Sequence, residues 1–134
     1  MAWVATMNQD LWELPVPSTA LTRGPNFREL AKRNCELEYY VETEDGGDRR
    51  EAVIFEGVEA YKCTYLTALT VEMIKTAYDK IVRISPSQWL AEVKRSNALF
   101  YQNLPQAPKE PQHLMICFDD GPCYEFICID FKTP

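Results

Sequence analysis

The residues best suited to chemistry gather near the end of the chain. The only histidine, His113, is followed by Cys117, Cys123 and Cys128, with three, five and four residues between successive members. Imidazole and thiolate groups bind zinc, and a thiolate beside an imidazole can act as a nucleophile. A structural zinc site needs four such groups in tetrahedral reach, and these intervals match no zinc motif. We therefore expect no metal, no cofactor and no catalytic residue here, only ordinary packing of these side chains.

The stretch that carries them has the pattern of a β-hairpin. Its turn is 119–122, in which Gly121 accepts a positive φ and Pro122 withholds a backbone donor. If these four residues form the turn, His113 lies opposite Cys128, whereas a three-residue turn would shift the register and mix the two faces. One predicted face then holds Leu114, Ile116, Phe118, Glu125, Ile127, Ile129 and Phe131, and the other holds His113, Met115, Cys117, Tyr124, Phe126, Cys128 and Asp130. Because both faces are largely apolar, the hairpin is predicted to lie mid-sheet, covered on both sides or joined to another subunit.

Glu125 is the unusual residue of the hairpin, because it is a carboxylate between two aromatic residues. A buried carboxylate is costly unless it is paired, and such groups are over-represented at functional sites. Tyrosines in predicted strands can line a pocket or an interface, and they are also ordinary strand formers. The candidate ligand site consists of Glu125, His113, Tyr124, Tyr39 and Tyr61. A catalytic version of this site is a small hydrolase-like enzyme, although a flat sheet rarely supplies the necessary cleft.

Length and composition predict one domain over residues 1–134. A content of 46% hydrophobic and 25% charged residues is typical of a soluble globular protein. No apolar run is long enough to span a membrane, and the N-terminus lacks the pattern of a secretory signal. Five cysteines, an odd number without a CxxC pair, favour reduced thiols. These features predict a cytoplasmic protein with no membrane partner.

The net charge of −6 is unevenly distributed. Residues 35–60 contain nine Asp or Glu against two Arg, whereas residues 61–112 contain seven basic and four acidic side chains. An acidic segment repels phosphate, so nucleic-acid binding is disfavoured. The same segment is either a solvated sheet face or a surface for a basic protein partner.

The N-terminal segment 1–25 is predicted to be an extended arm. Three prolines in its second half resist helix and central strand. Tryptophans are costly to leave in water, so the arm is expected to dock on its own domain or on a neighbouring protomer. Together with the apolar hairpin, this gives a candidate interface of Trp3, Trp12, Met115, Cys117, Phe126 and Cys128.

Periodicity and capping signals predict the remaining elements. They are a short helix over 26–34, a meander of strands over 35–42, 51–55 and 58–66, a helix over 70–78, a strand over 79–84, a helix capped by Ser85 that ends before Leu104, and a loop over 102–112. A single helix over 70–83 is the competing interpretation. The order predicts an α+β domain with an antiparallel or mixed sheet of five to six strands and two or three helices on one face.

In size, acidity and α+β pattern, the chain is similar to small acidic bacterial proteins, including immunity proteins that neutralise toxins. This similarity rests on overall character and includes no specific motif. It implies a non-catalytic module that binds another protein, and a homodimer completed by the hairpin or the arm is compatible with it. A small-ligand-binding domain or hydrolase-like enzyme around Glu125 and His113 is the alternative.

Overall fold

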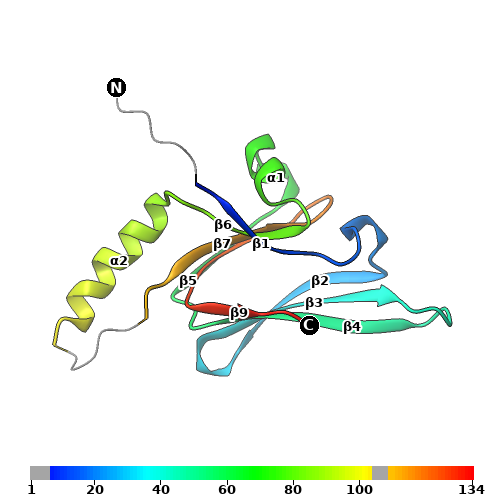
Figure 1. The fold of residues 1–134 in the computed structure, drawn as a ribbon, viewed down its shortest axis with the longest axis horizontal. Helices are drawn as coiled ribbons and strands as arrows, with labels where there is room; N and C mark the ends of the chain where they lie inside the picture. The colour runs from blue at the N-terminus through cyan, green and yellow to red at the C-terminus, as the bar shows by residue number, and fades with distance from the viewer. Residues whose placement is uncertain (1–6, 104–108) are drawn as a thin grey trace.

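Two antiparallel sheets pack face to face in the computed structural model, which describes residues 7–103 and 109–134 (Figure 1). The five-stranded sheet has the order β1-β6-β7-β8-β5, and the four-stranded sheet has the order β2-β3-β4-β9. The strands are β1 (Gln9–Glu13), β2 (Arg23–Leu30), β3 (Asn34–Glu42), β4 (Asp48–Glu56), β5 (Ala60–Thr64), β6 (Lys80–Arg83), β7 (Gln112–Cys117), β8 (Cys123–Cys128) and β9 (Asp130–Lys132), and the helices are α1 (Val71–Ala77) and α2 (Gln88–Tyr101). The α+β class is confirmed. The prediction of one sheet with five or six strands is wrong, because the described residues form nine strands in two sheets.

The β7–β8 hairpin lies in the middle of the five-stranded sheet, as predicted. Its inner face meets the four-stranded sheet, where the rings of Phe126 and Phe55 stack with their centroids 3.9 Å apart. Its outer face is partly covered by α1, whose Ala77 belongs to a smaller apolar cluster with Met115 and Cys117. The chain's own elements therefore contact both faces.

The register of this hairpin differs by one residue from the prediction. Cys117 pairs with Cys123, and Met115 pairs with Glu125. The amide of Phe118 donates to the carbonyl of Pro122, so the turn itself is the three residues 119–121 rather than the predicted four. A one-residue slip reverses the faces of a strand. Tyr124, Phe126 and Cys128 therefore point into the sandwich, while Cys123, Glu125 and Ile127 point outward.

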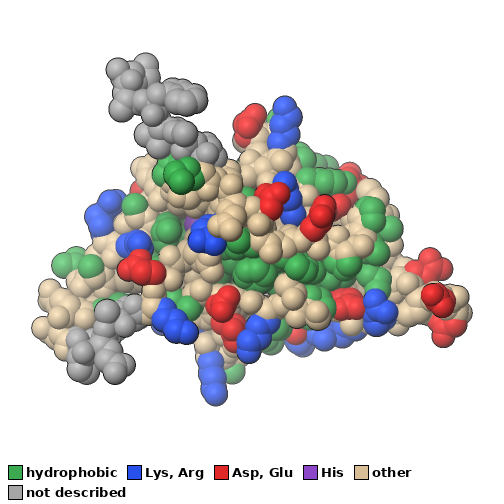
Figure 2. All heavy atoms as spheres, in the orientation of Figure 1, with side chains coloured by type: hydrophobic (Ala, Val, Ile, Leu, Met, Phe, Trp, Pro, Cys, Tyr) green, Lys and Arg blue, Asp and Glu red, His purple; other side chains and the backbone are tan. Residues whose placement is uncertain are grey.

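The β3–β4 hairpin confirms the predicted strand with one wet face. Cys35, Leu37, Tyr39 and Val41 are buried in the sandwich. The opposite face carries ion pairs, in which Arg50 bridges Glu36 and Glu38. Figure 2 shows basic side chains along the lower edge of the molecule, near this sheet, and acidic ones at the tip formed by the β3–β4 turn. Much of the acidity of segment 35–60 is therefore neutralised by neighbouring arginines.

Two predicted elements before β6 are corrected. Segment 26–34 is mostly strand β2, because Phe27 packs toward the core while Arg28 pairs with Glu36 on the outer face. The third strand of the expected meander, β5, instead joins the other sheet and pairs with β8. The chain changes sheets at Gly57, which has a φ of 62° and whose added Cβ would lie 2.7 Å from Ile129. That close approach requires glycine.

The N-terminal arm docks on its own domain over its described part. Strand β1 pairs with β6 at the edge of the five-stranded sheet, and Trp12 packs partly buried against the core. The prediction for Trp3 lies outside the described residues. Within the described part of the chain, no helix is both long and apolar enough to cross a membrane.

The break between helix α1 and strand β6 is confirmed, and Thr70 caps α1 by accepting from the amide of Met73. The next cap is Ser87 rather than Ser85. The Ser85 amide donates to the side chain of Asn8, and the preceding amide of Ile84 donates to the carbonyl of His113. These bonds hold the chain against the sheet through position 85, so the helix begins after Ser87.

Candidate functional site

An open trough crosses the outer face of the five-stranded sheet beside α1. Its volume is about 460 Å³. The side chains that define it are Lys62 and Thr64 of β5, Glu72 and Met73 of α1, Met115 of β7 and Glu125 of β8. The apolar floor and the ionisable residues thus come from elements far apart in the sequence.

Glu125 and His113 form a buried pair at this face. The Nε2 atom of His113 lies 2.9 Å from Oε1 of Glu125, and the residues are 6% and 8% exposed respectively. They lie on neighbouring strands, on the same face and diagonally placed, because Glu125 pairs with Met115, two residues after His113. The corrected register brings them together, since the predicted register had placed them on opposite faces.

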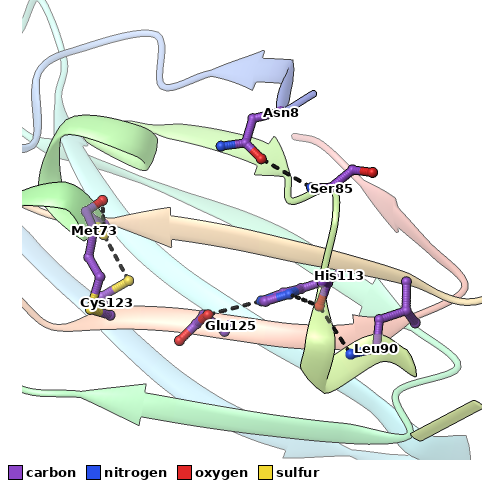
Figure 3. A network of polar contacts seen from close by, with 9 residues as sticks. Asn8, Met73, Ser85, Leu90, His113, Cys123 and Glu125 are labelled. Carbon is purple, nitrogen blue, oxygen red and sulfur yellow. Dashed lines mark hydrogen bonds and ion pairs between the residues drawn. The ribbon is translucent and has the colours of Figure 1, made fainter. Parts of the chain in front are cut away.

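Ser87 fixes the orientation of the histidine. Its hydroxyl oxygen accepts from the Leu90 amide at 3.0 Å and lies 2.7 Å from Nδ1 of His113 (Figure 3). The two ring nitrogens thus have separate partners, Ser87 at Nδ1 and Glu125 at Nε2. The histidine is held from both sides, and it in turn holds one carboxylate oxygen in place.

The second oxygen of Glu125 is differently placed. Among the described residues, Oε2 has no hydrogen-bond partner, and it is not fully enclosed by protein. Glu125 is one of the residues that line the trough, and its side chain is 10% exposed. A carboxylate with one oxygen fixed and the other open is preorganised to bind a donor.

Lys62 is the nearest strand neighbour of Glu125 across the β5–β8 pair. Its ammonium nevertheless lies 4.2 Å from the ring centroid of Trp89, in a cation–π contact. Trp89 in turn meets His113 edge-on, with centroids 5.1 Å apart. The first turn of α2 therefore holds both the histidine and the lysine that flank the carboxylate.

The thiols of this face are poorly suited to nucleophilic chemistry. Cys117 and Cys123 are fully buried, with their sulfur atoms 2.7 Å apart. The hydrogen bond with Cys117, together with burial, raises the pKa of the Cys123 thiol. A nucleophilic thiol needs a lowered pKa. Cys128 lies on the inner face, where burial raises its pKa to about 12. The prediction that His113 lies opposite Cys128 is wrong, because His113 pairs with Ile127.

The structure separates the predicted tyrosines from Glu125 and His113. Tyr39 and Tyr124 lie in the sandwich core, on the opposite side of the five-stranded sheet from the trough. Tyr61 donates its hydroxyl proton to Glu29 near the end of β2. Of the five candidate ligand-binding residues, only Glu125 and His113 come together.

The candidate interface residues are also distributed over different layers. Met115 and Cys117 pack near α1, whereas Phe126 and Cys128 lie between the two sheets. Trp12 packs against the sandwich core. The described residues contain no group of three or more His, Cys, Asp or Glu side chains arranged to hold a metal ion.

Sequence reasoning did not identify Ser87, Lys62 or Trp89 as parts of the site. The only available signal was the capping pattern of Ser-Pro-Ser-Gln, which points to a helix start and does not indicate a contact with His113. Comparisons with protein-family models, curated proteins and solved structures found no match.

Proposed function

We propose that this chain is a non-catalytic module that binds another protein through the trough. The observation that carries the proposal is the open Oε2 atom of Glu125, on a residue only 8% exposed and fixed through its other oxygen by His113. A partner that donates a hydrogen bond to a desolvated, fixed acceptor binds more tightly, and a partner without a donor there binds more weakly. An open trough across a sheet suits a protruding segment of a protein partner.

Three features favour binding over catalysis. The trough is open to solvent, whereas most enzymes and small-ligand sites enclose their ligand. The Ser87 hydroxyl caps α2, and Ser87 is not among the described residues that line the trough. The buried thiols have raised pKa values, which oppose thiolate formation. In keeping with the net charge of −6 and the free cysteines, we place the protein in the cytoplasm, without nucleic-acid partners.

Site-specific photo-crosslinking in the producing cells tests this proposal. A photoreactive amino acid at Thr64, in the trough, should capture one defined protein, identified by mass spectrometry. The matched control places the same group at the exposed Glu44 in the β3–β4 turn, which should not capture that protein. Capture of the same set of proteins from both positions would contradict a specific trough. A bacterial toxin is one class of partner consistent with an acidic, non-catalytic chain.

A second candidate function is ester or amide hydrolysis by Ser87, His113 and Glu125. It is favoured by two contacts in series, 2.7 Å from the serine hydroxyl to the imidazole and 2.9 Å from the imidazole to the carboxylate. A fluorophosphonate probe, which labels activated serines, should modify Ser87 if this is correct. Absence of labelling at Ser87, with a known serine hydrolase labelled in the same sample, would remove this candidate.

A further inference from the structure

We infer that the group taken into the trough is the ammonium of a lysine side chain on the partner protein, bound at Oε2 of Glu125. This inference rests on the proposed function and adds the chemistry of recognition. It follows from the charge of the trough, from the one oxygen of Glu125 that is not bonded to His113 and from the apolar side chains of the lining.

The charge of the trough favours a cation. Two carboxylates, Glu72 and Glu125, line it together with one lysine, Lys62. That lysine directs its ammonium to Trp89 rather than forming an ion pair with Glu125. Among the described residues, the polar contact of Glu125 is with His113, and no lysine or arginine lies within ion-pair distance of it. A lysine from a partner would therefore give this carboxylate a contact that no Lys or Arg of the described chain supplies.

The geometry favours lysine over arginine. An arginine binds a carboxylate best through two parallel hydrogen bonds, one to each oxygen. Here Oε1 is occupied by His113, which leaves one acceptor for a ligand. An ammonium is a compact charge that needs only a single acceptor direction. The Met73, Ile84 and Met115 side chains lining the trough suit the four-carbon stem of a lysine.

Lys62 is an internal competitor of such a ligand. Directly paired side chains on neighbouring antiparallel strands have Cβ atoms about 5 Å apart, so a change of rotamer could bring its ammonium toward Glu125. Removing this lysine should therefore strengthen binding of an incoming ammonium. This effect distinguishes a true cation site from a nonspecific apolar groove.

Nuclear magnetic resonance titration with Nα-acetyl-lysine methylamide tests the inference directly. The methyl groups of Met73 and Met115 and the indole of Trp89 report on the trough. The lysine amide should produce saturable shifts, the norleucine analogue should not, and the arginine analogue should bind several-fold more weakly. Glu125→Gln should raise the Kd for the lysine amide at least about tenfold, and Lys62→Gln should lower it.

A second variant guards against a folding defect in Glu125→Gln. Glu72 is exposed on α1, so Glu72→Gln should preserve the fold and raise the Kd about twofold to fivefold. Equal binding of the arginine or norleucine analogue, or an unchanged Kd in both carboxylate variants, would overturn the inference. Crosslinking from Thr64 is independent of these probes. If a partner is captured from Thr64 but the lysine amide does not bind, the inference of a lysine ligand is wrong and the proposed protein-binding function stands.

Discussion

Glu125 combines two properties that single residues rarely share, a buried carboxylate and an oxygen open to a surface trough. His113 holds the first oxygen, and Ser87 holds His113, so the acceptor is fixed by a chain of two contacts. The cost of burying the carboxylate is offset by hydrogen bonding on one side and by partial hydration on the other. This arrangement is stable without a ligand and ready for one.

Substitution of His113 should reveal the free-energy cost of burying the Glu125 carboxylate. We expect His113→Ala to lower the free energy of unfolding by about 1–3 kcal/mol, because it leaves Oε1 of a buried carboxylate without a donor. Urea denaturation measures this change. In the double variant His113→Ala with Glu125→Leu, a substantial part of the loss should be recovered. Equal or greater destabilisation in the double variant would show that packing, rather than the pair, determines the effect.

Tyr39 is a second residue whose surroundings make a prediction. Its hydroxyl is buried in the sandwich and has no hydrogen-bond partner among the described residues. Tyr39→Phe removes an unsatisfied polar atom and should leave the free energy of unfolding unchanged or raise it by up to about 1 kcal/mol. Tyr61→Phe, which removes a satisfied hydroxyl at the surface, is the matched control. A loss above 1 kcal/mol in Tyr39→Phe would reveal a hidden partner for this hydroxyl.

At the scale of elements, α2 matters through its first turn. It contains no buried residue, yet its cap Ser87 and its Trp89 contact His113. Ser87→Ala should lower the free energy of unfolding by about 1–2 kcal/mol, because it removes both the cap and the histidine's hydroxyl partner. Ser85→Ala, which keeps the backbone amide that bonds to Asn8, should cost less than about 0.5 kcal/mol. A larger loss of stability in Ser85→Ala than in Ser87→Ala would show that Ser85 is the cap.

Local pattern predicted the elements better than their assembly. Alternation identified β3 and β4, and capping signals identified α1 and the existence of α2. The strands β1, β2 and β9 were not identified, because short edge strands with prolines or charges have weak periodicity. The chain passes between the two sheets at Gly57 and again between β8 and β9. Both crossings depend on contacts between residues far apart in the sequence.

The site was predictable only in part. Glu125 and His113 were both among the five candidate ligand-binding residues, but the predicted register placed them on opposite faces. Both faces of the hairpin are apolar, so hydrophobic pattern could not distinguish two registers that differ by one residue. The observed turn is shorter than predicted, and both Asp120 and Gly121 have positive φ in it. Lys62 and Ser87 reach the pair through tertiary contacts that leave no local signal.

At the scale of the whole molecule, the core should make the protein sensitive to alkaline pH. Burial raises the pKa of Cys35 to about 11 and the pKa values of Tyr39 and Tyr124 to about 12, from ordinary values of 9.0 for cysteine and 10.0 for tyrosine. The unfolded chain then loses protons before the folded chain does, so stability falls as pH rises. We expect the free energy of unfolding to be constant below about pH 8 and to decline progressively between pH 9 and pH 12. A flat profile over that range would contradict the burial of these groups.

The layered packing also bears on self-association. The apolar hairpin suggested a second subunit, but α1 and the four-stranded sheet contact its two faces. We therefore expect a monomer of 15.5 kDa by light scattering at micromolar concentration. A concentration-dependent dimer would contradict this expectation, and the exposed Leu99 and Phe100 of α2 would be the first residues to substitute.

The role proposed for Glu125 is to make the trough a protein-binding site. Its most direct test is the affinity of the partner captured from Thr64, measured by isothermal titration calorimetry. We predict that Glu125→Gln raises the Kd at least about tenfold, whereas Glu44→Gln in the distant β3–β4 turn leaves it unchanged. Equal affinity of the natural chain and of folded Glu125→Gln would contradict the account.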